Sequence, residues 1–510
     1  MSETGIRVVY GLLGDGNLAV VDDLANRFGV RFVPVNREDI AVSAADAHVR
    51  LTGELAVASV THGPGLTNTL TALHEAARAG TPMLLLTGDT DPEDLAHNQK
   101  IDQPATVGPT GADYVRVASA STITADFSRA VRQAALQRRP VVLDVPAPFL
   151  AQQVEYEWHS SGIHEAPSVS PDPDLLDRAL GVIASSSRPI ILAGRGCVEA
   201  GARDEVENLA EVLNAPVATT LGARGLFRGH PFELGVMGTV GSTLCAEIVA
   251  EADCLVALGA GLNRYTTAYG SLLQGKSVVQ VDTDRAAVGR WCHVDAVVVG
   301  DGSIVAGQMT EMLSRHDEAP PGLVSEGLRD RLAAYDPSAE FEDRSDGNRI
   351  DSRTLMIWLD RVMPADRVVV CDVGGFMETP LRYLEVVDPR AQVLPARFGA
   401  VGLGMGAAIG AGVADPRRPT LLVTGDGGWM MGGINGLDTA VREGLDLVVL
   451  VLNDGGYGIE RRALEARGSA SEIASMPWPD PNEVAVALGG ESLVVRSRAD
   501  LEKARGAIEN

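Results

Sequence analysis

The chain has 510 residues, a formal net charge of −25 at pH 7 and a hydrophobic fraction of 45%. Because this length exceeds what a single hydrophobic core organises, several domains of ordinary size are expected. The acidic charge argues against a nucleic-acid partner, since affinity for a phosphate backbone depends on basic patches. No apolar stretch of about 18 residues offers a membrane span, and the N-terminus lacks the basic and apolar regions of a signal peptide.

The cysteines indicate a reducing environment. They are odd in number and scattered along the chain, and no two of them form a Cys-x-x-Cys pair. Neither a disulfide framework nor a zinc site is therefore expected, and the protein is predicted to be cytoplasmic. The five cysteines are Cys197, Cys245, Cys254, Cys292 and Cys371.

Two linker-like segments divide the chain into three blocks. Residues 152–174 and 316–352 are rich in acids, Ser and Pro and lack sustained periodicity. In each block, apolar strand-like runs alternate with amphipathic helices, which predicts an α/β class with parallel, Rossmann-like sheets. The predicted domains are 1–160, 175–315 and 350–510. The strands are expected at 30–35, 55–60, 83–87 and 141–145, then at 189–193, 216–219, 254–258 and 277–281, and finally at 368–372, 420–424 and 445–452.

Polar residues follow the predicted strands of the first domain. Glu38 opens a helix-like stretch, where an exposed acid would complement the helix dipole. His62 lies in the loop 61–68, whose Gly-Pro-Gly turn lets the backbone approach a ligand closely. A histidine hydrogen-bonded at a strand end would also explain His62. A second polar cluster, 97–103, could equally be a solvated loop.

The most informative feature lies in the third domain. Two apolar runs each end on an oxygen-bearing side chain, Asp426 and Asn453, and residues 433–444 between them suffice for one crossover helix. Such a βαβ unit of about 30 residues brings the carboxyl ends of both strands side by side. Hard oxygen ligands beside a glycine-rich turn suit a Mg²⁺ ion that carries a diphosphate. The turn glycines are Gly425, Gly427 and Gly428. An ordinary Rossmann-like crossover would explain the Gly-Asp-Gly triplet by itself. It is a poor explanation for the complete arrangement of strand, turn, helix, strand and Asn.

This spacing resembles the cofactor signature of thiamine-diphosphate-dependent enzymes, in the branch of acetolactate synthase and the 2-oxo acid decarboxylases that act on benzoylformate and pyruvate. The resemblance implies a pyrimidine-binding, a central and a diphosphate-binding domain in succession. It also implies that Asp426, Asn453 and the carbonyl of Gly455 hold Mg²⁺, with Tyr457 among the residues that bind the cofactor.

Glu38 occupies the position of the glutamate that activates the cofactor in this family. There the acid faces the aminopyrimidine and promotes the tautomer that removes the proton from the reactive thiazolium carbon. In the family, this glutamate of one subunit meets the metal motif of another. A homodimer or homotetramer with the site at the subunit interface is therefore implied.

A glycine-rich stretch, 397–411, resembles the family loop beneath the thiazolium. By this match the carbonyl of Gly399 and the amide of Val401 bind the aminopyrimidine edge, and the Val401 side chain props the cofactor into its bent shape. A helix of small residues packed tightly on a sheet would explain the same sequence. The stretch can serve both cofactor binding and helix packing.

Three further residues are candidates for proton transfer or substrate contact. His62 precedes the Gly-Pro-Gly turn, where the acetolactate branch has a small residue, and decarboxylases of the wider family use a histidine. Gln99 aligns with the catalytic glutamine of a family segment, Phe-Gln-Glu-x-Asp-Gln. Glu460 resembles the acid of simple decarboxylases and is expected beside the ring, buried with a raised pKa; a charged opening of a surface helix is the alternative.

Departures from the acetolactate pattern affect the functional prediction. The family's Gln-His pair is absent at Gly375 and Phe376, which argues against close identity with those synthases. Because residues 259–264 lack the family's Arg-Phe-Asp-Asp-Arg element, FAD is not expected. Residues 478–481 are a candidate cover for the site.

We therefore predict a thiamine-diphosphate- and Mg²⁺-dependent enzyme that decarboxylates a 2-oxo acid, then releases an aldehyde or passes the enamine to a second carbonyl. An acetolactate-synthase-like carboligase is the alternative within the class. Outside it stand a flavin- or nicotinamide-binding Rossmann protein and a non-catalytic relative, and intact Glu38, Asp426 and Asn453 argue against the latter.

Overall fold

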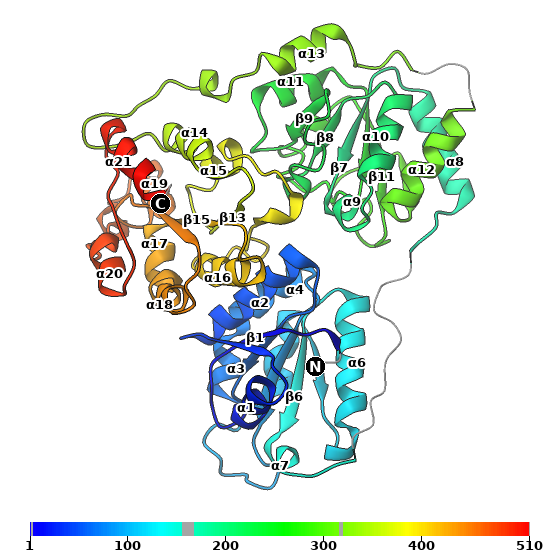
Figure 1. Cartoon of the computed structure of the whole chain (residues 1–510). Helices are drawn as coiled ribbons and strands as arrows, with labels where there is room; N and C mark the ends of the chain where they lie inside the picture. The colour runs from blue at the N-terminus through cyan, green and yellow to red at the C-terminus, as the bar shows by residue number, and fades with distance from the viewer. Residues whose placement is uncertain (2–3, 156–167, 316–319, 509–510) are drawn as a thin grey trace.

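Three parallel sheets, each covered by helices, make up the chain. The computed structural model describes residue 1 and residues 4–155, 168–315 and 320–508. In Figure 1 the N-terminal domain, in blue and cyan, lies below the green central domain and the yellow-to-red C-terminal domain. The sheets confirm the predicted α/β class with three parallel-sheet domains.

The first sheet has six parallel strands in the order β2-β1-β3-β4-β6-β5. Its strands are β1 Val8–Gly11, β2 Arg31–Pro34, β3 Val57–Val60, β4 Leu84–Asp89, β5 Asp113–Arg116 and β6 Val141–Pro146. The helices are α1 Leu18–Asn26, α2 Glu38–Thr52, α3 Pro64–Asn68, α4 Leu70–Ala79, α5 Gln103–Val107, α6 Ile123–Gln137 and α7 Ala147–Leu150.

The central sheet also has six parallel strands, in the order β12-β11-β10-β7-β8-β9. Its strands are β7 Pro189–Ala193, β8 Val217–Thr219, β9 Glu233–Val236, β10 Cys254–Leu258, β11 Ser277–Asp282 and β12 Ala296–Val299. The helices are α8 Pro173–Ala184, α9 Arg195–Glu199, α10 Arg203–Val212, α11 Thr243–Glu251, α12 Gly302–Leu313 and α13 Glu326–Ala333.

The third sheet has four parallel strands in the order β14-β13-β15-β16. Its strands are β13 Val368–Cys371, β14 Gln392–Val393, β15 Thr420–Gly425 and β16 Leu447–Leu452. The helices are α14 Ser352–Val362, α15 Glu378–Tyr383, α16 Gly404–Ala414, α17 Asp426–Gly428, α18 Ile434–Arg442, α19 Gly458–Ala466, α20 Pro481–Ala487 and α21 Arg498–Ile508.

Each predicted strand corresponds to an observed strand, with ends that differ by a few residues. The predicted crossover helix 433–444 is α18. The strands absent from the prediction are β1, β5, β9, β12 and β14. Four of these lie at sheet edges, where one side of a strand meets solvent and the apolar run is short. The domain limits remain predictions, and residues 156–167 of the first predicted linker lie outside the described residues.

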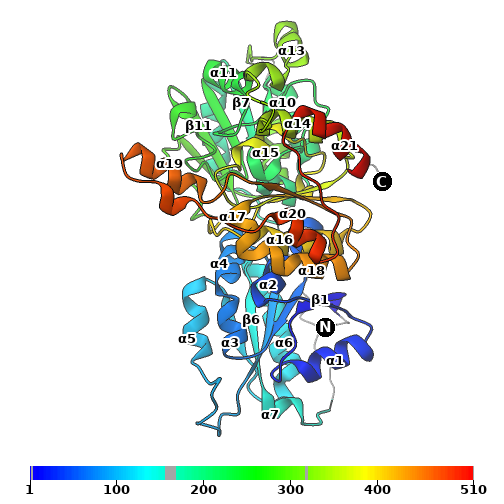
Figure 2. The same cartoon turned by 90° about the vertical axis from the view of Figure 1, so that its left-hand side faces the viewer.

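Helices α2 and α16 join the first and third domains (Figure 2). A Cβ atom on Gly410 would lie 2.1 Å from the carbonyl oxygen of Ala44, and one on Gly406 would lie 2.7 Å from the Cβ atom of Ser43. Only glycine permits this closeness, because any side chain at either position would push the two backbones apart. The small residues of 404–414 therefore do serve helix packing.

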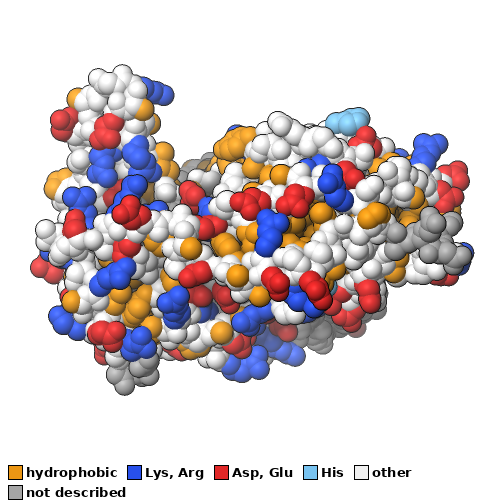
Figure 3. Space-filling view, turned by 90° about the horizontal axis from the view of Figure 1, so that it is seen from above, with side chains coloured by type: hydrophobic (Ala, Val, Ile, Leu, Met, Phe, Trp, Pro, Cys, Tyr) orange, Lys and Arg blue, Asp and Glu red, His pale blue; other side chains and the backbone are white. Residues whose placement is uncertain are grey.

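Two further features of the molecule are the distribution of charge on its surface and the length of its helices. On the face seen from above, acidic and basic side chains are interspersed (Figure 3). In the described part of the chain, no helix is both long and apolar enough to span a bilayer.

Candidate active site

The predicted metal ligands meet where β15 and β16 end. These parallel strands pair in register up to Gly425 and Leu452, so the residues that follow them are neighbours. The amide of Gly455 donates to Oδ2 of Asp426 at 2.9 Å and to Oδ1 of Asn453 at 3.0 Å. All three predicted ligands are thus brought together by one shared donor.

Backbone amides surround the Asp426 carboxylate, which is 5% exposed. Its Oδ1 accepts from the amide of Gly427 at 3.0 Å, and its Oδ2 also accepts from the amide of Gly456 at 2.9 Å. Burial raises the pKa of Asp426, with a smaller contribution from the Asp454 charge, whereas the amides oppose the rise. A carboxylate, an amide oxygen and the carbonyl of Gly455, which accepts from the amide of Met476 at 3.0 Å, form an all-oxygen donor set, which fits Mg²⁺.

The glycines of the turn after β15 have different constraints. A Cβ atom on Gly428 would lie 2.3 Å from Oδ2 of Asp372 and 2.6 Å from the Thr424 hydroxyl. At Gly427 the nearest atom would be a Tyr457 ring carbon at 3.5 Å, which is ordinary contact. Packing therefore requires glycine at 428, whereas a methyl group at 427 would only make ordinary contact with the neighbouring rings.

Asp372, at the end of β13, is a site residue that sequence reasoning missed. It is 1% exposed, and burial raises its pKa. Its carboxylate accepts from the amides of Gly402 and Gly404 and from the Thr424 hydroxyl at 2.9 Å. Asp372 thereby ties the glycine-rich loop to β15. The sequence signal that could have identified Asp372 is its position at the end of a predicted strand, because that strand lies beside the one that ends in Gly-Asp-Gly.

The loop 397–401 is fixed on one side and open on the other. Phe398 stacks on His74 of the N-terminal domain, with ring centroids 4.6 Å apart, and its amide donates to Glu75 at 2.6 Å. Gly399 has a φ of +81° and is exposed, and the neighbouring Val401 is 39% exposed. The two residues predicted to contact the pyrimidine are therefore accessible to a ligand.

An aromatic pair covers the cradle. The rings of Tyr457 and Trp478 pack edge to face with centroids 5.4 Å apart. Both lie within 3.6 Å of the Cβ position of Gly427. Trp478 belongs to the segment 478–481 that was a candidate cover, and it lies beside the turn.

Glu38 is the first residue of α2 and is half-buried. Its Oε2 accepts a hydrogen bond from the side-chain amide of Asn68 at 3.1 Å, which ties it to the Gly-Pro-Gly loop. Within the described residues of one chain, no hydrogen bond or ion pair joins Glu38 to the predicted metal ligands.

His62 and Gln99 lie together in the N-terminal domain. His62 is 3% exposed, and within the described residues neither of its ring nitrogens has a hydrogen-bond partner. The same holds for Oε1 of Gln99. Burial lowers the pKa of His62, against the Asp15 carboxylate, which acts to raise it. The buried imidazole lies beside Gln99, whose side chain acts to raise its pKa, and its part in proton transfer remains a prediction.

Glu460 differs from its expected surroundings. It lies in the first turn of α19 and is exposed in the single chain, so the predicted burial is not found within one subunit. The start of α19 lies beside the exposed Gly375, where a Cβ atom would lie 2.7 Å from the guanidinium of Arg462 and 2.8 Å from the Ile459 side chain. A glutamine at 375, as in the acetolactate pattern, would require the side chains of Arg462 and Ile459 to move.

Comparison with protein-family models shows the family to which the chain belongs. Family models described as thiamine pyrophosphate enzyme match in three places: the N-terminal TPP binding domain at residues 1–106, the central domain at 176–309 and the C-terminal TPP binding domain at 372–510. The chain belongs to the thiamine pyrophosphate enzyme family. This confirms the resemblance, and thiamine diphosphate is the cofactor for which the two outer domains are built.

Curated relatives of this thiamine pyrophosphate enzyme extend over nearly its whole length. It is 28% identical to an acetolactate synthase of Mycobacterium avium, over 96% of this chain and 80% of the relative. It is 27% identical to the large subunit of acetolactate synthase isozyme 3 of Escherichia coli, over 93% of this chain and 85% of the relative. A probable acetolactate synthase large subunit of Methanococcus aeolicus is 26% identical, over 89% and 79%. These similarities favour the predicted class over a flavin- or nicotinamide-binding Rossmann protein.

Proposed function

We propose that the protein is a Mg²⁺- and thiamine-diphosphate-dependent enzyme that decarboxylates a 2-oxo acid and transfers the remaining carbon unit to a second carbonyl. The observation that carries this proposal is the cluster of Asp426, Asn453 and Gly455 beside a glycine cradle. The relatives named acetolactate synthase favour carboligation over aldehyde release. Bound thiamine diphosphate would supply the nucleophilic carbon and the electron sink for decarboxylation.

The residues of the chain have distinct parts in this proposal. Asp426, Asn453 and the Gly455 carbonyl hold the metal, and the amides around Gly427 face the diphosphate. Glu38 keeps the pyrimidine in its reactive tautomer. His62, buried and with a lowered pKa, is neutral near pH 7 and can accept or donate a proton. Gln99 contacts the substrate.

A complete site requires a second copy of the chain in this proposal. Glu38 of one subunit meets the metal cluster of its partner in a homodimer or homotetramer. The exposure of Gly399 and Val401 supports a ligand and a partner on that side. FAD has no part in the proposed reaction. The five cysteines are free thiols, which supports the cytoplasm as the compartment.

The test is CO₂ release from a panel of 2-oxo acids that includes pyruvate, with thiamine diphosphate and Mg²⁺ added or omitted. We expect release that depends on both, and a decrease of about 100-fold or more in Glu38→Gln because tautomer formation is lost. Asp39→Asn is the matched control, since Asp39 pairs with Arg37 on the surface. A 2-hydroxy ketone product, identified by mass, supports carboligation, whereas an aldehyde indicates simple decarboxylation. Absence of both cofactor binding and CO₂ release contradicts the proposal.

A further inference from the structure

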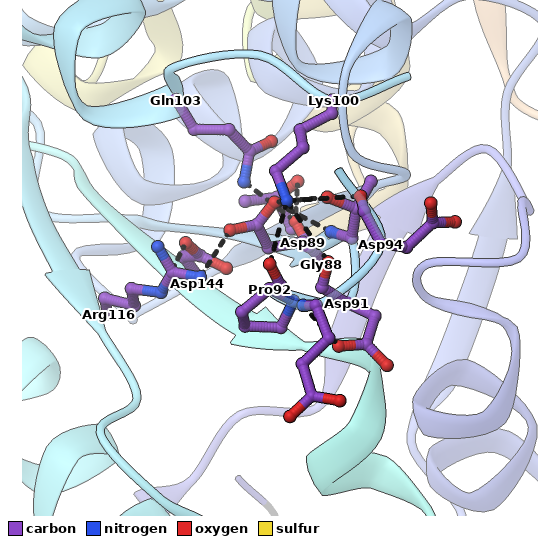
Figure 4. A network of polar contacts seen from close by, with 12 residues as sticks. Gly88, Asp89, Asp91, Pro92, Asp94, Lys100, Gln103, Arg116 and Asp144 are labelled. Atoms are coloured by element: carbon purple, nitrogen blue, oxygen red, sulfur yellow. Dashed lines mark hydrogen bonds and ion pairs between the residues drawn. The ribbon is translucent and has the colours of Figure 1, made fainter. Parts of the chain in front are cut away.

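The ammonium group of Lys100 uses all of its N–H donors to bind backbone carbonyls of a neighbouring turn. Its Nζ donates to the carbonyl oxygens of Asp91, Pro92 and Asp94 at 3.3, 3.2 and 3.2 Å (Figure 4). An ammonium group offers three donors, so the set of contacts is complete.

The turn that Lys100 binds has little apolar packing of its own. The amide of Glu93 donates to the Asp91 carboxylate at 2.9 Å, and the amide of Asp94 donates to the Asp91 carbonyl at 3.1 Å. Leu95, the apolar side chain of this turn, is 82% exposed. Because no buried side chain anchors residues 91–96, their order depends on hydrogen bonds, of which those from Lys100 reach furthest along the chain.

The backbone of Lys100 is hydrogen-bonded within the turn that carries Gln99, which is proposed to contact the substrate. Its amide donates to the His97 carbonyl at 3.1 Å, and the amide of Gln99 donates to Nδ1 of His97 at 3.2 Å. The His97 ring lies edge-on to His62, with centroids 5.5 Å apart. One short turn therefore fixes the position of both His97 and Gln99.

The other end of this segment is fixed by Gln103. Its buried side-chain amide donates to the Gly88 carbonyl at 3.0 Å and accepts from the Gly63 amide at 3.4 Å. Gly63 leaves no space between the two loops, because a Cβ atom there would lie 2.4 Å from the carbonyl oxygen of Gln99. Gln103 thus holds the segment against the His62 loop, and Lys100 holds its outer side.

We propose that Lys100 is a positioning residue, which acts by fixing His97 and Gln99 against His62. The inference rests on the proposed function for the role of His62 and Gln99 in the reaction. The contact set predicts that removing the ammonium group releases residues 91–100 while the sheet and the metal cluster stay intact.

The first test is hydrogen–deuterium exchange on unliganded Lys100→Met. Met keeps the length of the side chain and removes its donors. We expect the amides of residues 91–100 to exchange at least about ten-fold faster than in the unchanged protein, as expected for loss of local protection. Lys100→Arg should restore most of the protection. The control is Lys503→Met, since Lys503 is an exposed lysine in α21.

The second test measures the reactivity of His62 toward diethyl pyrocarbonate by peptide mass spectrometry. His62 is buried under this segment, so we expect its modification to be at least about five-fold faster in Lys100→Met, in proportion to local opening. His48 is an internal control, because it is buried in α2 and bonded to the Tyr10 hydroxyl at 2.8 Å. Unchanged exchange of 91–100 together with unchanged His62 reactivity overturns the inference.

Kinetics separate this inference from the proposed function. If the unchanged enzyme releases CO₂, Lys100→Met should reduce kcat about ten-fold, with thiamine diphosphate affinity unchanged and with rescue by Lys100→Arg. If Lys100→Met releases the loop but leaves kcat unchanged, the positioning role is overturned. If the unchanged enzyme has no activity, the proposed function fails, whereas the exchange and reactivity results still decide whether Lys100 fixes the segment.

Discussion

The amide of Gly455 donates to the buried carboxylate of Asp426 at 2.9 Å. This bond brings the end of β16 onto the end of β15 and leaves the carboxylate, with its negative charge, at the base of the glycine cradle. Asp426→Asn keeps the shape and an acceptor but removes the charge that would bind Mg²⁺. We expect thiamine diphosphate affinity in the presence of Mg²⁺ to fall about 100-fold, or about 2.7 kcal/mol, in calorimetry.

The matched control for that variant is Asp454→Asn. Asp454 is adjacent in sequence to Asn453 but pairs with Arg461 at 3.2 Å. Its replacement should leave cofactor affinity within about two-fold of the unchanged protein, because an exposed ion pair contributes little. Equal losses in the two variants would mean that net charge near the cradle, and not metal ligation, explains the effect.

The location of Glu38 leads to a complementation experiment. If Glu38 acts on the metal cluster of a partner, a hybrid of Glu38→Gln and Asp426→Asn chains contains one intact site. Random pairing of two inactive variants, co-expressed with different tags, should then recover about a quarter of the unchanged activity. Recovery near zero, with hybrids demonstrated by tandem purification, would place the whole site within one chain.

Two adjacent glycines should respond differently to one methyl group. In Gly428→Ala the new Cβ atom must displace Asp372 and the Thr424 hydroxyl, which it would approach to 2.3 and 2.6 Å. We expect a loss of about 1–3 kcal/mol in stability, seen as a lower Tm. Gly427→Ala adds a methyl group in ordinary contact with Tyr457, so its Tm should stay within a degree or so of the unchanged protein. Calorimetry of the two variants side by side measures the difference.

A buried acid in the first sheet makes stability depend on pH. Asp144 is fully buried in β6, accepts a hydrogen bond from the Tyr114 hydroxyl, and lies near Asp89 and Arg116 (Figure 4). The pKa of Asp144 is raised from 3.8 to about 7, chiefly by burial; the Asp89 charge adds to this rise, and the Tyr114 and Arg116 contacts oppose it.

The sign of this dependence follows from proton binding. Between about pH 4 and pH 7 the folded chain holds a proton that the unfolded chain has lost, so the contribution of Asp144 to stability falls as pH rises. Asp144→Asn stays uncharged. Its Tm relative to the unchanged protein should therefore increase by a few degrees between about pH 5 and pH 8. Asp23→Asn, on the surface helix α1, should show no such trend; a parallel trend in both would exclude Asp144 as the origin.

The fold was predictable where apolar runs are long and bounded by turns. The strands β4, β6, β7, β10 and β15 are buried along most of their length, and a continuous apolar run marks such strands in a sequence. β14 has two residues, too few for any periodicity to identify. The edge strands β5 and β9 mix polar and apolar residues because one side faces solvent.

The site was predictable to the extent that it follows strand order. Asp426 and Asn453 are close because their strands pair in register, which spacing alone indicates. Asp372 and Lys100 were missed because their partners are backbone groups of loops that only the tertiary structure brings near. The expected burial of Glu460 is not found in the single chain, where the residue is exposed in the first turn of α19.

The packing of α2 against α16 also has a consequence during synthesis. Residues 404–414 cover the face of α2 that carries Ile40, Ser43 and Ala44. Residues 53–403, which include the central domain, are translated between these two helices, and at ordinary elongation rates they delay α16 by roughly 20–70 s. Throughout that interval the nascent N-terminal domain presents an uncovered apolar helix face. Such a surface is prone to aggregation until the last domain has left the ribosome and covers it.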